Sequence, residues 1–167
     1  NDTDVYIRNE LAEMSRRGFR LLLVEPASDK ELNLLSKRAR EIMDASGVKG
    51  AHAIFIFGHG SKTSIQLDQA QLDESGSIDI SDGGDLPEFS GLLERGGWVV
   101  DLSCDTGRGG VGSGNVVEFE RKQLFPQAGE GRIVAPGAPT TLSGVRVFYE
   151  DDNSIKDVNF PVEAHKG

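Results

Sequence analysis

The chain has very little cysteine: Cys104 is the only one among its 167 residues. A single thiol cannot form a disulfide within the chain, which is typical of proteins from reducing compartments. The length is sufficient for one domain to bury a core without disulfides or metals. We therefore expect one domain, residues 1–167, in which any function of the thiol depends on its reactivity.

Basic residues are also scarce: 18 Lys and Arg stand against 27 Asp and Glu, which gives a formal net charge of -9. This charge repels phosphate groups and argues against nucleic acid or an anionic membrane as a partner. No apolar run approaches the ~20 residues that span a bilayer. We expect a soluble protein without membrane insertion, whose partner is a protein or peptide substrate.

The N-terminus lacks an initiator methionine and the basic and apolar segments of a signal peptide. The first residue is asparagine. We expect a piece excised from a larger protein, either cytoplasmic or delivered to a reducing cytosol as part of that protein.

Helix-like and strand-like patterns alternate along the chain. Apolar residues at helical spacing predict helices over 3–17, 28–46, 86–95 and 115–124. Short apolar runs predict buried strands at 19–24, 51–57, 97–102, 132–135 and 144–149, followed by a polar end. Residues 64–68 are expected to form a hairpin arm, and 69–84 an acidic loop or hairpin. This alternation favours a three-layer α/β/α sandwich with a mostly parallel sheet.

Two of the predicted strands end at residues that can carry chemistry. One apolar run is followed by Gly58-His59-Gly60, and a later one by Ser103-Cys104. Reactive groups in open parallel sheets gather outside the carboxyl ends of the strands. If the two strands are neighbours, the imidazole and the thiol can face each other.

A histidine beside a cysteine suits nucleophilic catalysis. A free thiol has a pKa near ~8.5, and a neighbouring imidazole that takes its proton makes it an effective nucleophile. The glycines around His59 let the backbone approach a substrate, and the N–H groups of Gly60 and Cys104 are candidate donors to an oxyanion. We therefore predict His59 and Cys104 as a catalytic dyad.

The two motifs resemble the clan CD cysteine peptidases, the caspase-like group that includes metacaspases, separases, self-processing toxin peptidases and CHAT domains. Here FIFGHG and WVVDLSCDTG follow the order of those families, and LFPQAGEGRIVAPGAPTT is similar to the next helix exit and strand. The likeness spans roughly residues 19–149. It implies a caspase-like fold and a cysteine endopeptidase with Cys104 as nucleophile, His59 as general base or acid and Gly60 as oxyanion donor, including cleavage of its own parent chain.

The acidic composition suggests a substrate preference. Clan members that cleave after Arg or Lys use an acidic first pocket, and Asp101, Asp105 and the loop with Asp79 and Asp82 are candidates to line it. We hypothesise cleavage after a basic residue. Two alternatives stay open, namely a Cys-His deamidase or acyltransferase and a catalytically inactive caspase-like module that binds a protein.

Other possible ligand motifs are weaker. Residues 107–112 satisfy the dinucleotide pattern GxGxxG, but the following strand ends in Ala135-Pro136 instead of an acidic ribose ligand, so a substrate loop is the better interpretation. His52, His59, His165 and Cys104 lack the spacing of metal ligands. We therefore expect neither a metal nor another cofactor, and we assign Trp98 to the core and His165 to a frayed end.

Overall fold

The computed structural model describes residues 2–67, 76–79, 91–127 and 129–167. Its helices are α1 (Asp2–Arg16), α2 (Asp29–Ala45) and α4 (Val116–Leu124), and η2 (Leu142–Gly144) is a short 3₁₀ turn. Its strands are β1 (Ala51–Ile56), β2 (His59–Gly60), β3 (Ser64–Gln66), β4 (Ser77–Asp79), β5 (Leu93–Asp101), β6 (Gly131–Pro136), β7 (Arg146–Tyr149), β8 (Ile155–Asn159) and β9 (Ala164–Lys166). Within the described residues, no helix is long and apolar enough to cross a membrane.

The central sheet has four strands in the order β1-β5-β6-β9. β1, β5 and β6 are parallel, and β9 runs antiparallel to β6. Ile56 pairs with Asp101, so the carboxyl ends of β1 and β5 lie side by side. The predicted mixed α/β fold with a mostly parallel sheet is confirmed, and so is the neighbourhood of the two strands that lead to His59 and Cys104.

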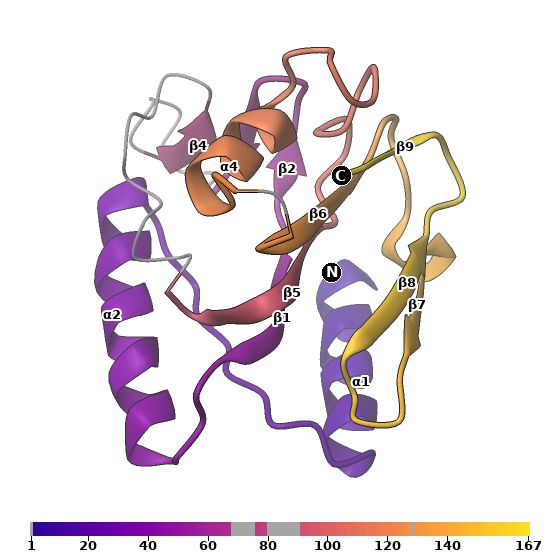
Figure 1. Cartoon of the computed structure of the whole chain (residues 1–167). Coiled ribbons are helices and arrows are strands. Elements are labelled where there is room, and N and C mark those ends of the chain that lie inside the picture. Colours follow the sequence, from indigo (N-terminus) through magenta and orange to yellow (C-terminus); the bar gives the residue numbers. More distant parts are fainter. Residues whose placement is uncertain (1, 68–75, 80–90, 128) are drawn as a thin grey trace.

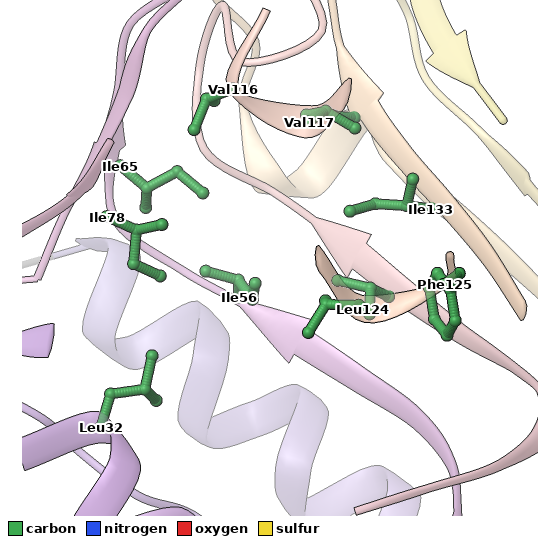
Figure 2. Packing of buried hydrophobic residues seen from close by; sticks show 11 residues of the cluster. Leu32, Ile56, Ile65, Ile78, Val116, Val117, Leu124, Phe125 and Ile133 are labelled. Carbon is green, nitrogen blue, oxygen red and sulfur yellow. The ribbon is translucent and has the colours of Figure 1, made fainter. Parts of the chain in front are cut away.

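One face of the sheet is covered by α2, α4 and the small β2-β3-β4 sheet (Figure 1). Side chains from all of these elements except β2 meet those of β1, β5 and β6 in one apolar cluster (Figure 2): Leu32, Ile56, Ile65, Ile78, Val99, Val116, Val117, Leu124, Phe125, Ile133 and Ala135. The helices α2 and α4 each begin at a residue whose side chain caps the helix. The Ser28 hydroxyl accepts a hydrogen bond from the Glu31 N–H at 3.1 Å, and the side-chain oxygen of Asn115 accepts one from the Glu118 N–H at 3.0 Å.

The other face of the sheet is covered mainly by a β-hairpin. Trp98, Val100 and Val134 pack there against Ile155 and Val158 of β8. The burial of Trp98 confirms its assignment to the core. α1 lies beside this hairpin (Figure 1), and its exit contacts the hairpin through the edge of the Phe19 ring on Tyr149. The expected outer helix layer is therefore partly replaced by β7 and β8.

Two predicted elements are wrong. Residues 19–24 form no strand, and residues 20–24 are exposed, with Leu23 61% and Leu22 49% accessible. An apolar run specifies a strand only where a neighbouring strand accepts its hydrogen bonds, and β1 pairs only with β5 in the described sheet. The helix expected over 86–95 is contradicted at residues 93–95, which belong to β5 and in which Leu93 pairs with Ala51 of β1, while residues 86–90 lie outside the described part of the chain.

The polar end of the chain is more ordered than its composition predicted. After β7 the chain forms β8 and then β9, which pairs with β6. His165 on β9 is 1% exposed, which contradicts the frayed end expected for it, because sheet pairing draws this segment against the glycine loop at Gly107. Burial lowers the pKa of His165.

Candidate functional site

The turn after β5 carries Cys104 and is fixed by hydrogen bonds at both ends. The Leu102 N–H donates to the Ile56 carbonyl at 2.9 Å, which ties the turn to the end of β1. The Gly107 N–H donates to the Pro136 carbonyl at 2.9 Å, which ties it to the end of β6. The thiol therefore sits on a rigid connection at the carboxyl edge of three parallel strands.

Inside this turn, buried side chains form hydrogen bonds with the backbone N–H and carbonyl groups of Ser103. Asp101 Oδ1 accepts from the Ser103 N–H at 2.8 Å, and the Thr106 hydroxyl donates to the Ser103 carbonyl at 2.9 Å. Asp105 has a φ of 65°, in the left-handed region that few residues with side chains adopt. These interactions determine the direction in which the Cys104 side chain leaves the backbone.

The Cys104 thiol is half-buried and lies between two segments of chain. Its Sγ is 3.6 Å from the Thr140 carbonyl oxygen, to which the S–H donates. Among the described residues, the Cys104 N–H has no hydrogen-bond partner. The sulfur is thus not sealed in hydrocarbon, and the amide beside it is free to donate to a ligand.

His59 and Gly60 form β2, the edge strand of the β2-β3-β4 sheet. The Ser61 N–H donates to the Ser64 carbonyl, which makes Gly60 and Ile65 the next, non-hydrogen-bonded pair of the antiparallel ladder. The Gly60 N–H therefore points away from β3. This leaves a second amide without a partner in the ladder, on a strand that packs on the Cys104 turn.

Gly60 packs directly on the Cys104 turn. A Cβ built at Gly60 would collide with the Cys104 carbonyl oxygen and would lie 2.7 Å from Thr106 Cγ2 and 2.9 Å from Ser103 Cβ. Only glycine leaves room for this approach. The structure thus brings the predicted histidine segment and the predicted cysteine segment together, although 44 residues separate Gly60 from Cys104 in the sequence.

This contact predicts the effect of Gly60→Ala. The added methyl group forces β2 and the Cys104 turn apart, and we expect a loss of about 1–3 kcal/mol in the free energy of unfolding and a several-fold change in the alkylation rate of Cys104. Gly96→Ala is the control for the labelling rate: its φ of 80° strains an alanine and lowers stability, but its methyl group meets open space. We expect it to leave the alkylation rate of Cys104 unchanged, and an equal change of this rate in both variants would show that the close packing of Gly60 is unimportant.

The His59 imidazole is exposed next to this contact. Among the described residues it forms no hydrogen bond with Cys104, whose thiol is directed to Thr140 instead. The structure therefore places the two predicted catalytic residues on segments that touch, but it shows no contact between the imidazole and the thiol. Catalytic hydrogen bonds in ligand-free enzymes are often long and tighten only when substrate binds.

The acidic residues expected to line a substrate pocket are placed differently. Asp101 is completely buried, so its assignment to substrate binding is wrong: its carboxyl group is needed inside the turn. Asp105 is partly buried, and Arg108 Nη2 donates to its Oδ1 at 2.6 Å, which engages its charge within the chain. Asp79 lies on β4, half-buried, and Asp82 lies outside the described residues.

A cavity of about 300 Å³ lies between the glycine loop that follows the Cys104 turn and the segment that leads into β9. It is lined by Gly107, Gly109, Gly110, Gly137, Glu163 and Ala164. Its two walls continue into the segments that flank the sulfur, because Gly107 follows Cys104 and Gly137 precedes Thr140 by three residues each. A second hollow of about 360 Å³ lies at residues 47–49, before β1 and hence at the opposite edge of the sheet.

The glycine loop that matches GxGxxG is occupied by the chain itself. The Gly114 N–H donates to Glu118 Oε2 at 2.6 Å, and the Gly112 N–H donates to the other oxygen of the same carboxylate. Ser113 and Asn115 bind the loop carbonyls of Arg108 and Gly110. Two amides that a phosphate would need are thus taken by the first turn of α4, which agrees with the sequence-based argument against a nucleotide site.

One buried residue at this edge was missed in the sequence. Glu120 on α4 is 0% exposed, and within the described part of the chain neither of its carboxyl oxygens has a hydrogen-bond partner. The helical spacing of Val116, Val117, Glu120 and Leu124 places it on the buried face of α4, which is a signal that the sequence did contain. Glu163 and Thr140 gave no such signal, because only the fold brings them near Cys104.

No cluster of three or more His, Cys, Asp or Glu side chains suited to a metal ion occurs in the described ranges. His52 is engaged elsewhere: its Nδ1 lies 2.5 Å from Glu94 Oε1 on β5. Comparison of the chain with models of known protein families, with curated proteins and with solved structures finds no match, so the likeness of its two motifs to clan CD stays a prediction.

Proposed function

We propose that this chain is a clan CD-like cysteine peptidase with a caspase-like fold, which cleaves a protein substrate and includes its parent chain among its targets. The observation that carries the proposal is the packing of Gly60 against the Cys104 turn. It supports a site in which a thiol, an imidazole and two free amides meet at the carboxyl edge of a parallel sheet.

The reaction follows from these groups. His59 takes the proton of the Cys104 thiol, and the sulfur attacks the carbonyl carbon of the scissile bond. The Cys104 and Gly60 N–H groups stabilise the negative oxygen of the tetrahedral intermediate. His59 then gives the proton to the leaving amine, and water, deprotonated by His59, hydrolyses the thioester and restores the thiol.

The cavity between the glycine loop and the segment before β9 suggests which side chain precedes the cleaved bond. Of the described residues that line it, Glu163 alone is charged, and the rest of the wall is mostly glycine backbone. A carboxylate at the rim of a polar cavity suits the cationic end of Arg or Lys. The preference for a basic residue remains part of the proposal, with Glu163 in place of Asp101 and Asp105.

A cleavage profile on a denatured proteome tests this function. We expect new termini after Arg and Lys with the wild-type domain, none with Cys104→Ala, and a weaker basic preference with Glu163→Gln. Glu150→Gln, which removes an exposed carboxylate at the end of β7, is the matched control and leaves the profile unchanged. An identical profile for wild type and Cys104→Ala would rule out the peptidase.

One observation favours the binding module as a second candidate, namely the thiol hydrogen bond to Thr140 instead of His59. A module of this kind has an inert thiol and no turnover. A deamidase or acyltransferase would share the acyl-enzyme and differ in the products. Mass spectrometry of the domain and of the peptides after incubation separates the three functions. A binding module gives no adduct on Cys104, a peptidase gives a hydrolysed peptide bond, and a deamidase or acyltransferase gives a changed side chain.

A further inference from the structure

Two carboxyl groups are buried where β5 packs on α4, behind the Cys104 turn: Asp101 lies on the same face of β5 as Val99, and Glu120 on the same face of α4 as Val117 and Leu124. Asp101 ends β5 and Glu120 lies on α4, and each is 0% exposed. Asp101 Oδ2 and both Glu120 oxygens have no hydrogen-bond partner among the described residues. Such groups are rare in folded proteins, because each unpaired buried charge is strongly destabilising.

Two neighbouring buried carboxylates cannot both be charged at low cost. Burial raises the pKa of Asp101 to about 6, although the Ser103 N–H opposes this change. Burial, and then the charge of Asp101, raise the pKa of Glu120 well above its ordinary value. The pair therefore keeps a proton to a higher pH than two separate, exposed carboxyl groups would.

No cation of the described residues neutralises this pair. Arg121, next to Glu120 on α4, donates to the Gly131 carbonyl at 3.2 Å. Lys122 acts on Glu118, whose carboxylate binds the glycine loop. On its own turn, Asp101 accepts a hydrogen bond from the Ser103 N–H, and the Thr106 hydroxyl is engaged by the Ser103 carbonyl.

The pair is joined to the thiol through the backbone. Asp101 Oδ1 holds the Ser103 N–H, and Ser103 directly precedes Cys104. We propose that Asp101 and Glu120 hold one proton between them and that this carboxyl pair positions the turn that carries Cys104. Asp101 and Glu120 are positioning residues, because Asp101 acts through Ser103 and Glu120 acts through Asp101.

The shared proton matters for the reactivity of the thiol. It limits the negative charge behind Cys104 to one, whereas two carboxylates would repel the thiolate more strongly and raise the pKa of the thiol. This role in catalysis rests on the proposed peptidase function. The position of the turn and the state of the pair do not, and both are measurable without turnover.

Matched variants separate the two roles of Asp101. Asp101→Asn keeps an oxygen that accepts from the Ser103 N–H but removes the charge, whereas Asp101→Leu removes both. The rate of Cys104 alkylation by iodoacetamide is followed from pH 5 to 10. Its plateau at high pH reports the accessibility and placement of the thiolate, and its midpoint reports the pKa of the thiol.

We expect Asp101→Asn to keep the plateau within about twofold of wild type and to lower the midpoint, since a negative charge near the sulfur is lost. Asp101→Leu is expected to change the plateau at least fivefold. Glu41→Gln, an exposed carboxylate on α2, is the control and changes neither. Equal plateaus for Asn, Leu and wild type would overturn the positioning role.

Carboxyl ¹³C NMR tests the pair itself, on the wild-type domain and on Glu120→Gln. One carboxyl signal titrates far above the ordinary range in the wild type and disappears in the variant, and the titration of Asp101 moves to lower pH. If both carboxyls titrate near pH 4, the pair does not exist. This result decides the proposal even if Asp101→Leu fails to fold, and it stands whether or not the domain cleaves peptides.

Discussion

Replacement of His59 by alanine lowers kcat/KM for a peptide substrate by about 10²–10⁴-fold, the range that general acid–base catalysis supplies. The imidazole is the proposed carrier of the proton from the Cys104 thiol to the leaving amine. Of the other histidines, His52 binds Glu94 and His165 is buried. Cys104→Ala abolishes turnover altogether. Initial rates on a cleaved sequence from the proteome profile provide the measurement.

His52→Ala is the matched control for this prediction. His52 is also half-exposed near the sheet, but it lies in β1 and pairs with a carboxylate of β5. Its loss is expected to leave kcat/KM within about threefold of wild type. Equal losses for the two histidines would show that the effect comes from stability or charge and not from a dyad.

Among the substitutions proposed for this chain, we expect Glu120→Gln to have the largest effect on the pH dependence of the free energy of unfolding. In the unfolded chain Glu120 ionises near its ordinary pKa of 4.5, whereas burial keeps it protonated in the fold to a higher pH. A raised carboxyl pKa gives stability that is complete at low pH and lost as pH rises toward the folded pKa. The wild type therefore loses about 1.4 kcal/mol per pH unit relative to the variant over this window.

Urea unfolding of both proteins at pH 5, 6, 7 and 8 measures this difference. The two free energies of unfolding are expected to be similar at pH 5, where the neutral carboxyl and the amide are both unpaired, and to diverge steadily above it. Glu41→Gln on the surface of α2 is expected to run parallel to wild type. Parallel curves for Glu120→Gln as well would mean that Glu120 is ionised in the folded protein.

Local patterns predicted the central part of the fold well. The helices α1, α2 and α4 and the strands β1, β5 and β6 lie close to their expected positions, because each carries its own periodicity or apolar run. The strand expected at 19–24 is absent, and residues 93–95 extend β5 where a helix was expected. In both cases the availability of a neighbouring strand decided the outcome, and that is not a local property.

The candidate site was predictable in its two segments but not in its surroundings. Glycines beside His59 and a strand end before Cys104 were visible in the sequence, and the fold brings Gly60 onto the turn. Asp101 was assigned to a pocket because it is acidic and near Cys104, yet strand alternation turns it into the protein toward α4. Thr140 and Glu163 come from the return of the chain through β6 and β9, which tertiary structure alone determines.

The proposed mechanism requires that the imidazole of His59 acts on the sulfur of Cys104. The pH dependence of iodoacetamide labelling tests this most directly, in a comparison of wild type, His59→Ala and His52→Ala under conditions in which all three are folded. We predict that Cys104 is labelled readily at neutral pH in the wild type and in His52→Ala, and that His59→Ala needs a higher pH for the same rate. An unchanged labelling profile after loss of His59 would contradict the dyad.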